Sequence, residues 1–471
     1  MIAVLLLLGC GGGTESAPDV VTGGELVDTA RGEAEVPVVA VPERIDGFRS
    51  DAASAGFAVQ DGRFEFLDYG RCCLPGASCL WNNPSTPYGL YALPPAPGQT
   101  GADHDVRDGM SQYFHLREDE ALVLLGHTPP PSRYFSFRSY KAATQVPDWS
   151  MVIGSLGPST NILTIGDAMG TSAPFDAPMA LVTTMDGAVE AEVHALLEAN
   201  GFASTEIHDD RIVPEVVNAG LETGDDLFMS VTRIAVVEDP ARAEALYADP
   251  GWTLLRLTPS TERPSEAPHP RPDFLPRGTG TDESRWAEAL EALDAAVVEA
   301  YAPQAGVRRE AFAAWFETLD CVEEGFCSGD IRDRWYARVE SFPMADEATF
   351  AVVIGVNHER TGKASYSNFA VDTVRNEIGL SAVNSRDMVG TARWLLPDHP
   401  QADDLYAWVV ARDCALRPEP HCIEVPYACP GVQPWERMFI SFRAYLEPTT
   451  GAAPVDEELL LDRVFWFGAA E

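Results

Sequence analysis

A proline-rich stretch at residues 259–281 most constrains how this chain of 471 residues can fold. Prolines recur along it, at Pro264, Pro268, Pro270, Pro272 and Pro276. Because proline fixes φ and lacks a backbone N–H, such a stretch can extend neither a helix nor a sheet ladder. We therefore expect a linker there, with one domain at residues 46–258 and another at residues 282–471.

Apolar runs on both sides of this linker predict a mixture of strands and helices. The predicted strands lie at residues 121–125, 180–184, 227–236, 350–354, 405–410 and 438–445. The predicted helices lie at residues 189–197, 286–301 and 312–319, and a further short helix begins at Asp239-Pro240. The expected fold class is α+β, with two mixed α/β-sheet domains stabilised by disulfides.

Two sequence similarities occur in the same order in both halves. Residues 122–137 and residues 351–369 each contain an apolar strand, a glycine, a polar loop and an aromatic strand. Residues 227–233 are likewise similar to residues 438–443, and an acid-proline pair follows each. The pattern indicates a degenerate duplication of one α+β unit. Because strand-forming sequences are alike in composition, chance similarity is the alternative.

The first residues account for an odd number of cysteines. The chain has nine cysteines, and the first follows a short apolar run and a glycine. Residues Leu7, Leu8, Gly9 and Cys10 resemble the lipobox of bacterial lipoproteins. The resemblance implies a signal peptide at residues 1–9, a lipidated Cys10 and a flexible tether to residue 45. The apolar run is too short to span a bilayer, although no lysine or arginine precedes it.

The same resemblance implies an exported protein that is held on a lipid bilayer through its acylated Cys10. Aspartate after the lipidated cysteine retains some bacterial lipoproteins on the inner membrane, and this chain has Gly11 there. The outer membrane is therefore expected rather than the inner. The rest of the chain resembles no family of known activity.

The remaining cysteines are even in number, as expected for disulfides in an exported protein. They are Cys72, Cys73, Cys79, Cys321, Cys327, Cys414, Cys422 and Cys429. Cys321 pairs most simply with Cys327, and Cys414 with Cys422, because each pair brackets a short turn. One of Cys72 and Cys73 is expected to reach Cys79, and the other a distant cysteine such as Cys429. Zinc bound by Cys414, His421, Cys422 and Cys429 is the alternative, although the spacing matches no zinc motif.

The formal net charge of −39 excludes one class of partner. It comes from 72 acidic residues against 33 basic residues. Such a field repels phosphate backbones, so nucleic-acid binding is not expected. The expected partners are the bilayer at Cys10 and a small molecule or an envelope protein.

The densest polar group follows the strand at 350–354. His358 has the chemistry of a base or a ligand, Glu359 could orient it, and Arg360 could hold a carboxylate or phosphate. His127 follows the corresponding strand of the first half, so the two histidines would converge if the halves pack face to face. A polar hairpin tip is the alternative interpretation of residues 355–363.

A second group, Asp398, His399 and Asp403, has residue types that suit calcium or another divalent metal. A stiff surface turn is the alternative. Two functions follow from these observations. The first is a non-catalytic envelope lipoprotein that binds a small molecule or an envelope protein. The second is an exported metal-assisted hydrolase that uses the His, Glu and Arg loops at the strand ends.

Overall fold

The computed structural model describes nine stretches of the chain. They are residues 40–67, 82–145, 149–274, 277–304, 306–313, 317–327, 329–375, 378–425 and 436–468. All of them belong to one compact unit, Ala40–Glu471. The lipobox-like residues with Cys10, and also Cys72, Cys73, Cys79 and Cys429, lie outside the described residues.

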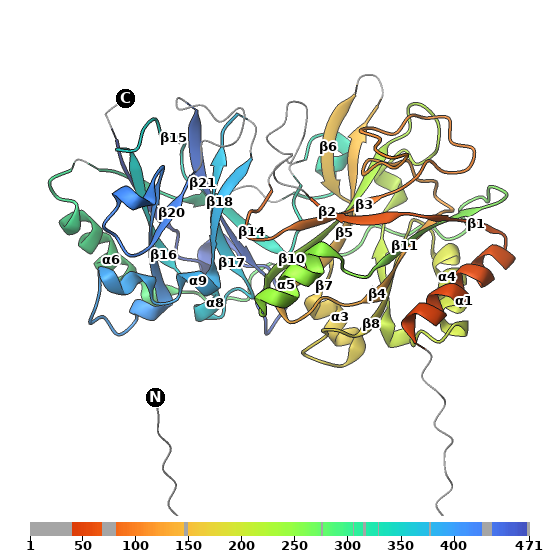
Figure 1. The fold of residues 1–471 in the computed structure, drawn as a ribbon, viewed down its shortest axis with the longest axis horizontal. Coiled ribbons are helices and arrows are strands. Elements are labelled where there is room, and N and C mark those ends of the chain that lie inside the picture. Colours follow the sequence, from red (N-terminus) through yellow and green to blue (C-terminus); the bar gives the residue numbers. More distant parts are fainter. Residues whose placement is uncertain are drawn as a thin grey trace, which may run out of the picture. The chain divides into compact units, whose positions relative to one another are not determined.

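The first half of the unit contains a sheet with helices on one face, the first outer sheet (Figure 1). Its strands follow in the order β1 (Phe57–Asp61), β11 (Thr253–Pro259), β4 (Ala121–His127), β8 (Pro178–Thr184) and β9 (Ile207–Arg211). The covering helices are α1 (Val41–Ser54) and α4 (Gly187–Ala199). Val123 and Leu125 of β4 pack with these helices, whereas Leu122 and Leu124 point into the core on the other face. The strand is therefore buried on both faces.

A second sheet, the first inner sheet, shares that core. Its strands are β2 (Arg63–Phe66), β3 (Tyr88–Ala92), β10 (Leu227–Val237), β5 (Ser132–Thr144) and β6 (Ser150–Ser155), with β7 (Thr160–Asn161) beside β5. Two helices, α3 (Ile162–Met169) and α5 (Pro240–Ala248), lie in the same half.

The second half repeats this plan. Its outer sheet has the order β12 (Val307–Glu310), β22 (Arg463–Phe467), β16 (Phe350–Val356), β19 (Leu405–Ala411) and β20 (Cys422–Glu424). Its inner sheet has the order β13 (Phe312–Ala313), β14 (Arg334–Arg338), β21 (Arg437–Tyr445), β17 (Ser367–Thr373) and β18 (Gly379–Asn384), with β15 (Phe342–Pro343) beside β21. The helices are α6 (Ala287–Ala300), which packs on the outer sheet, α7 (Asp320–Glu324), α8 (His358–Thr361) and α9 (Ser385–Met388).

The strand orders of the two halves correspond one to one. Strand β16 occupies the place of β4, and β21 occupies the place of β10. Each outer sheet also has a parallel pair at one edge, β8 with β9 and β19 with β20. The two sequence similarities fall on these equivalent strands. The α+β class is thus confirmed, and the chain forms two similar halves.

Most predicted elements are present, including the helix that Asp239 caps through the N–H groups of Ala241 and Arg242. The helix predicted at 312–319 is wrong. Phe312 begins β13 and pairs with Arg338 of β14, so cross-strand pairing overrides the helical spacing of its apolar side chains. Helix α1 also starts inside the segment expected as tether, because Val41 and Ile45 are buried against the first outer sheet.

The described parts of the proline-rich segment, residues 259–274 and 277–281, are pinned to both halves. Near its start, the Asp186 carboxylate accepts hydrogen bonds from Ser265 Oγ at 2.6 Å and from the Ala267 N–H at 2.8 Å. Near its end, the N–H groups of Thr279 and Gly280 each donate to Glu458 at 2.5 Å. Side chains therefore satisfy the backbone groups that proline keeps out of regular structure.

Two of the predicted disulfides are formed, Cys321–Cys327 and Cys414–Cys422. The zinc alternative is wrong for Cys414 and Cys422, because disulfide sulfurs are not thiolate ligands. Among the described residues, no helix combines the length and the apolar character that a bilayer crossing requires.

Candidate functional site

The inner sheets of the two halves face each other through polar and aromatic side chains. The Tyr134 hydroxyl donates to Asp333 Oδ2 at 2.7 Å, and its ring lies 4.6 Å from that of Tyr445. Nearby, Asn368 Nδ2 donates to Asn83 Oδ1 at 2.9 Å. Each inner sheet thus has an apolar face toward its own outer sheet and a polar face toward the other half.

Two arginines occupy equivalent places on these polar faces. Arg233 of β10 lies opposite Tyr88 of β3, and Arg443 of β21 lies opposite Tyr336 of β14. The Arg233 guanidinium is 4.8 Å from the centre of the Tyr88 ring, and that of Arg443 is 5.8 Å from the centre of the Tyr336 ring. Each of the two similar halves therefore has a cation–π pair at this place.

Arg334 of β14 adds a third guanidinium, which lies against the Tyr336 ring. We call Arg233, Arg334 and Arg443 the arginine cluster. Burial raises the pKa of Tyr445, and the positive charges of all three guanidiniums oppose that rise. Burial lowers the pKa of Arg334 to about 10, so this side chain still carries its charge at neutral pH.

The cluster is buried, and close counter-charges are scarce among the described residues. The exposed fractions of Arg233, Arg334 and Arg443 are 4%, 4% and 1%, and Nε and Nη1 of each have no hydrogen-bond partner. Among the described residues, no carboxylate lies within 4.0 Å of Arg233 or Arg443, and Asp330 approaches Arg334 Nε only to 3.9 Å. A buried charge without a partner costs several kcal/mol. Such donors call for an anion that the chain itself does not supply.

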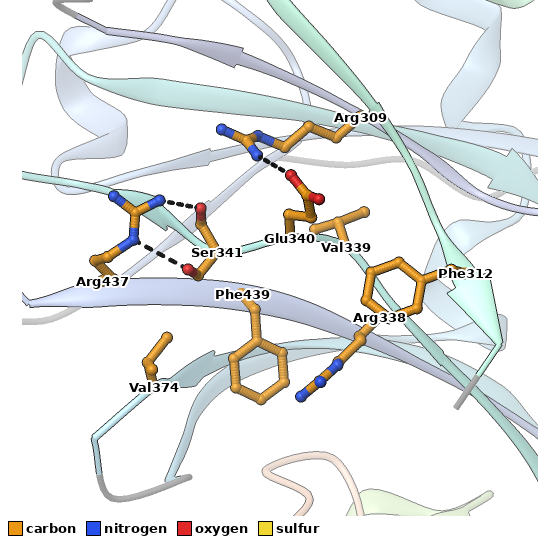
Figure 2. A pocket seen from close by; sticks show the side chains of 9 residues that line it. All are labelled: Arg309, Phe312, Arg338, Val339, Glu340, Ser341, Val374, Arg437 and Phe439. Carbon is orange, nitrogen blue, oxygen red and sulfur yellow. Dashed lines mark hydrogen bonds and ion pairs between the residues drawn. The ribbon is translucent and has the colours of Figure 1, made fainter. Parts of the chain in front are cut away.

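The same face of β14 continues to a surface pocket of about 560 Å³ (Figure 2). Arg334, Tyr336 and Arg338 alternate along this face, and Arg338 lines the pocket beside Phe439. Two further basic residues of the pocket are engaged, Arg309 with Glu340 at 3.2 Å and Arg437 with Ser341 Oγ at 3.0 Å. Basic side chains therefore extend from the buried cluster to an opening at the surface.

The predicted catalytic residues of the second half are mostly engaged in structural contacts. His358 is buried, and its Nδ1 lies 2.8 and 3.0 Å from the two oxygens of Glu283. Glu359 accepts from Ser385 Oγ at 2.5 Å and pairs with an arginine of the first half, Arg133, at 3.3 Å. Arg360 pairs with Asp404 at 3.3 Å. These contacts tie α8 to the segment before α6 and to the neighbouring half.

His127 ends β4 with an exposed side chain, and its backbone oxygen accepts from Trp252 Nε1 at 2.7 Å. The described residues show no hydrogen bond or ion pair between the His127 imidazole and the residues of α8. His358 and Glu359 thus contact different partners, Glu283 for the first and Ser385 with Arg133 for the second, and His127 is apart from these contacts.

The predicted metal ligands also have other roles. Asp403 forms a two-pronged ion pair with Arg393, at 2.7 and 2.6 Å, and this guanidinium takes the place that a cation would occupy. His399 Nδ1 accepts from the Gln401 N–H at 3.2 Å, and Asp398 is exposed. Among the described residues, the groups with metal-binding geometry lie elsewhere.

The sequence analysis missed the arginine cluster, although a signal was present. Arg233 and Arg443 are the last residues of the similar segments 227–233 and 438–443. An arginine inside an otherwise apolar strand is unusual, because guanidinium groups are rarely fully buried without a partner. Its recurrence in both halves marks the site.

Comparisons with known proteins give no family. No family model matches the chain, and no curated protein matches it. A solved structure of an uncharacterised protein from Burkholderia cenocepacia aligns with 90% of this chain and 86% of its own, at 12% sequence identity and a TM-score of 0.40.

Proposed function

We propose that this protein is an envelope lipoprotein that binds a small anionic molecule at the arginine cluster. The ligand would carry carboxylate or phosphate groups, since a guanidinium holds both with paired hydrogen bonds. The observation that carries the proposal is the set of three buried guanidiniums whose Nε and Nη1 have no partner. The chain has 72 acidic residues, so carboxylates are abundant, yet none neutralises Arg233 or Arg443 in the described structure.

The surrounding tyrosines fit such a ligand. The hydroxyl groups of Tyr140 and Tyr445 are buried without hydrogen-bond partners, and both could donate to an oxyanion. The rings of Tyr88 and Tyr336 hold two of the guanidiniums by their faces, which leaves the guanidinium edges for the ligand. The site is thus suited to recognition of an anion.

Full-length protein, purified in detergent without a tag, tests the binding. Sodium phosphate, sodium sulfate and sodium citrate should be compared in thermal unfolding with sodium chloride at equal ionic strength. We expect a saturable rise in Tm with at least one oxyanion, since a ligand at a hundred times its Kd stabilises by about 2.7 kcal/mol. Arg233→Met and Arg443→Met should both lose this response. Responses equal to that of the chloride control, or unchanged in the variants, would contradict the proposal.

Native mass spectrometry adds a test for a ligand retained from the cell. A mass excess in the native protein that disappears on denaturation, and that is absent from Arg233→Met, supports the proposal.

The lipoprotein part of the proposal rests on Leu7, Leu8, Gly9 and Cys10. Growth of expressing bacteria with labelled palmitate should label the protein, and Cys10→Ser should abolish the label. Fractionation should then find the wild-type protein with the outer membrane. An unlabelled wild-type protein would contradict the anchor and leave the anion site to be judged by its own experiment.

A further inference from the structure

A second cluster of chemically active side chains lies in the first half, where α4 passes β9. Glu190 and His194 are four residues apart on α4, so they share one face of the helix. Asp209 of β9 faces them, and its Oδ1 lies 2.7 Å from His194 Nε2. One ligand atom from each of the three residues lies within 4.8 Å of the others.

The proline-rich segment brings a second imidazole to this cluster. His269 is 8% exposed, its Nε2 has no hydrogen-bond partner, and that atom lies 3.4 Å from Glu190 Oε2. The N-cap of α4 fixes the approach, because Asp186 holds Ala267, and the His269 N–H donates to the Met185 carbonyl at 3.0 Å. A buried ring nitrogen aimed at a carboxylate group is thus built into the fold.

Gly187 makes the close approach feasible. A Cβ at this position would lie 3.3 Å from the Ala267 carbonyl oxygen and 3.7 Å from His269 Cε1. The first residue of α4 therefore leaves room for the extended segment to lie directly on the helix.

The cluster borders a pocket of about 490 Å³. Asp209, Arg211 and His269 line this pocket, together with residues of α3 and β9. His208 also lines it, and its Nε2 is buried without a hydrogen-bond partner. A ligand in the pocket would therefore reach groups beside the cluster.

We propose that Glu190, His194, Asp209 and His269 form a binding site for a first-row divalent transition metal such as Zn²⁺. Two imidazoles with two carboxylates are a donor set that such metals take, whereas calcium and magnesium prefer oxygen ligands alone. The site lies on different strands and helices from the arginine cluster, so neither proposal depends on the other.

Arg211 gives the proposal a distinctive consequence. Its Nε and Nη2 donate to Glu190 at 2.7 and 2.6 Å, and its side chain is 55% exposed. The guanidinium holds the carboxylate where the metal would bind, and it is free to turn into solvent when the metal displaces it. Arg211→Gln should therefore bind the metal more tightly than the wild type, which a purely structural cluster does not predict.

The test uses the full-length protein without a tag, after treatment with a chelator. Isothermal titration with Zn²⁺ should give one site per chain, and Co²⁺ should produce the absorption bands of a protein-bound ion. His194→Ala, His269→Ala and Glu190→Gln should each weaken binding by at least about tenfold, since loss of even an outer-shell partner has that effect. His127→Ala removes an exposed histidine elsewhere and is the matched control.

One-to-one binding that the three ligand variants weaken, that His127→Ala keeps and that Arg211→Gln strengthens supports the site. Absence of stoichiometric binding, or equal binding by His194→Ala, overturns it. Thermal unfolding of each variant identifies any that fails to fold. In that case Glu190→Gln, which preserves the side-chain shape, and Arg211→Gln, which changes an exposed residue, decide the question.

Discussion

Two buried arginines of the first half lie on facing sheets in opposite electrostatic situations. Arg256 of β11 is fully buried, and it donates to the two Glu120 oxygens at 2.9 and 2.8 Å and to the His115 carbonyl at 2.7 Å. Arg233 of β10 is almost as buried but has no carboxylate within 4.0 Å among the described residues, and its Nε and Nη1 lack partners. The chain thus pairs Arg256 with a carboxylate and leaves Nε and Nη1 of Arg233 without a partner.

The carboxyl groups near these arginines show the same contrast. Burial would raise the pKa of Glu120, but the charge and hydrogen bonds of Arg256 bring it below its usual value. Burial raises the pKa of Asp372, and the neighbouring Arg443 does not reverse that rise. A true ion pair therefore stabilises the outer sheet, and only a loose electrostatic interaction is present in the arginine cluster.

The largest change in the free energy of unfolding should come from removal of Arg256, the arginine that is paired with Glu120. Arg256→Met leaves Glu120 buried without its cation, which we expect to lower the free energy of unfolding by about 3–5 kcal/mol. Urea unfolding followed by tryptophan fluorescence measures this. A loss of less than about 1 kcal/mol would contradict the contrast between Arg256 and Arg233, because the Arg256–Glu120 pair would then contribute no more than an exposed ion pair.

The second largest change in stability should come from Asp333, a buried carboxyl group that has hydrogen bonds but no close cation. Asp333 accepts from the Tyr134 hydroxyl and from Asn161 Nδ2 at 3.0 Å, and burial raises its pKa to about 6. Since this pKa exceeds that of the unfolded chain, about 3.9, the stabilising contribution is complete below pH 4 and is lost as pH rises through 6. At pH 8 the lost contribution is on the order of 3 kcal/mol.

Asp333→Asn removes this titration. The variant should match the wild type near pH 4 and exceed its stability by on the order of 2 kcal/mol at pH 8. Urea unfolding at pH 4, 6 and 8 measures the difference. Parallel pH profiles of the two proteins would show that Asp333 has a cation within reach after all.

Removal of the unpaired Arg233 should raise the free energy of unfolding, whereas removal of Arg256 should lower it. Arg233→Met replaces a buried charge by an apolar side chain, so we expect ligand-free protein to gain about 1 kcal/mol of stability or more. Urea unfolding in chloride buffer, beside Arg256→Met, measures the change. A loss as large as that of Arg256→Met would make Arg233 a structural residue and contradict the contrast drawn above.

The smallest change in stability should come from Arg443, and it should distinguish this position from the equivalent Arg233. Arg443→Met should also stabilise ligand-free protein, but by less than about 1 kcal/mol, because Asp372 loses its nearby positive charge. Combining it with Asp372→Asn should restore a gain similar to that of Arg233→Met. A double-mutant cycle gives the coupling energy, and a value near zero would show that Asp372 is independent of Arg443.

Much of the fold could be predicted from local patterns, and the sites could not. The apolar runs at 121–125 and 350–354 became the central strands β4 and β16, and Asp239 with Pro240 began α5. In contrast, the expected helix at 312–319 depended on a partner strand that the local sequence does not reveal. Of the residues singled out for chemistry, His358 is held by Glu283 and Glu359 by Ser385.

The sequence by itself determined most of the strands and helices and the two local disulfides, and it indicated the similarity of the halves, because periodicity, caps and short loops depend on residues close along the chain. Tertiary structure alone decided which side chains meet. The inner sheets place Arg233 against Tyr88 and Arg443 against Tyr336, and the proline-rich segment carries His269 onto α4. Such meetings depend on strand order and sheet packing, which are set by the burial of the whole core rather than by any one segment.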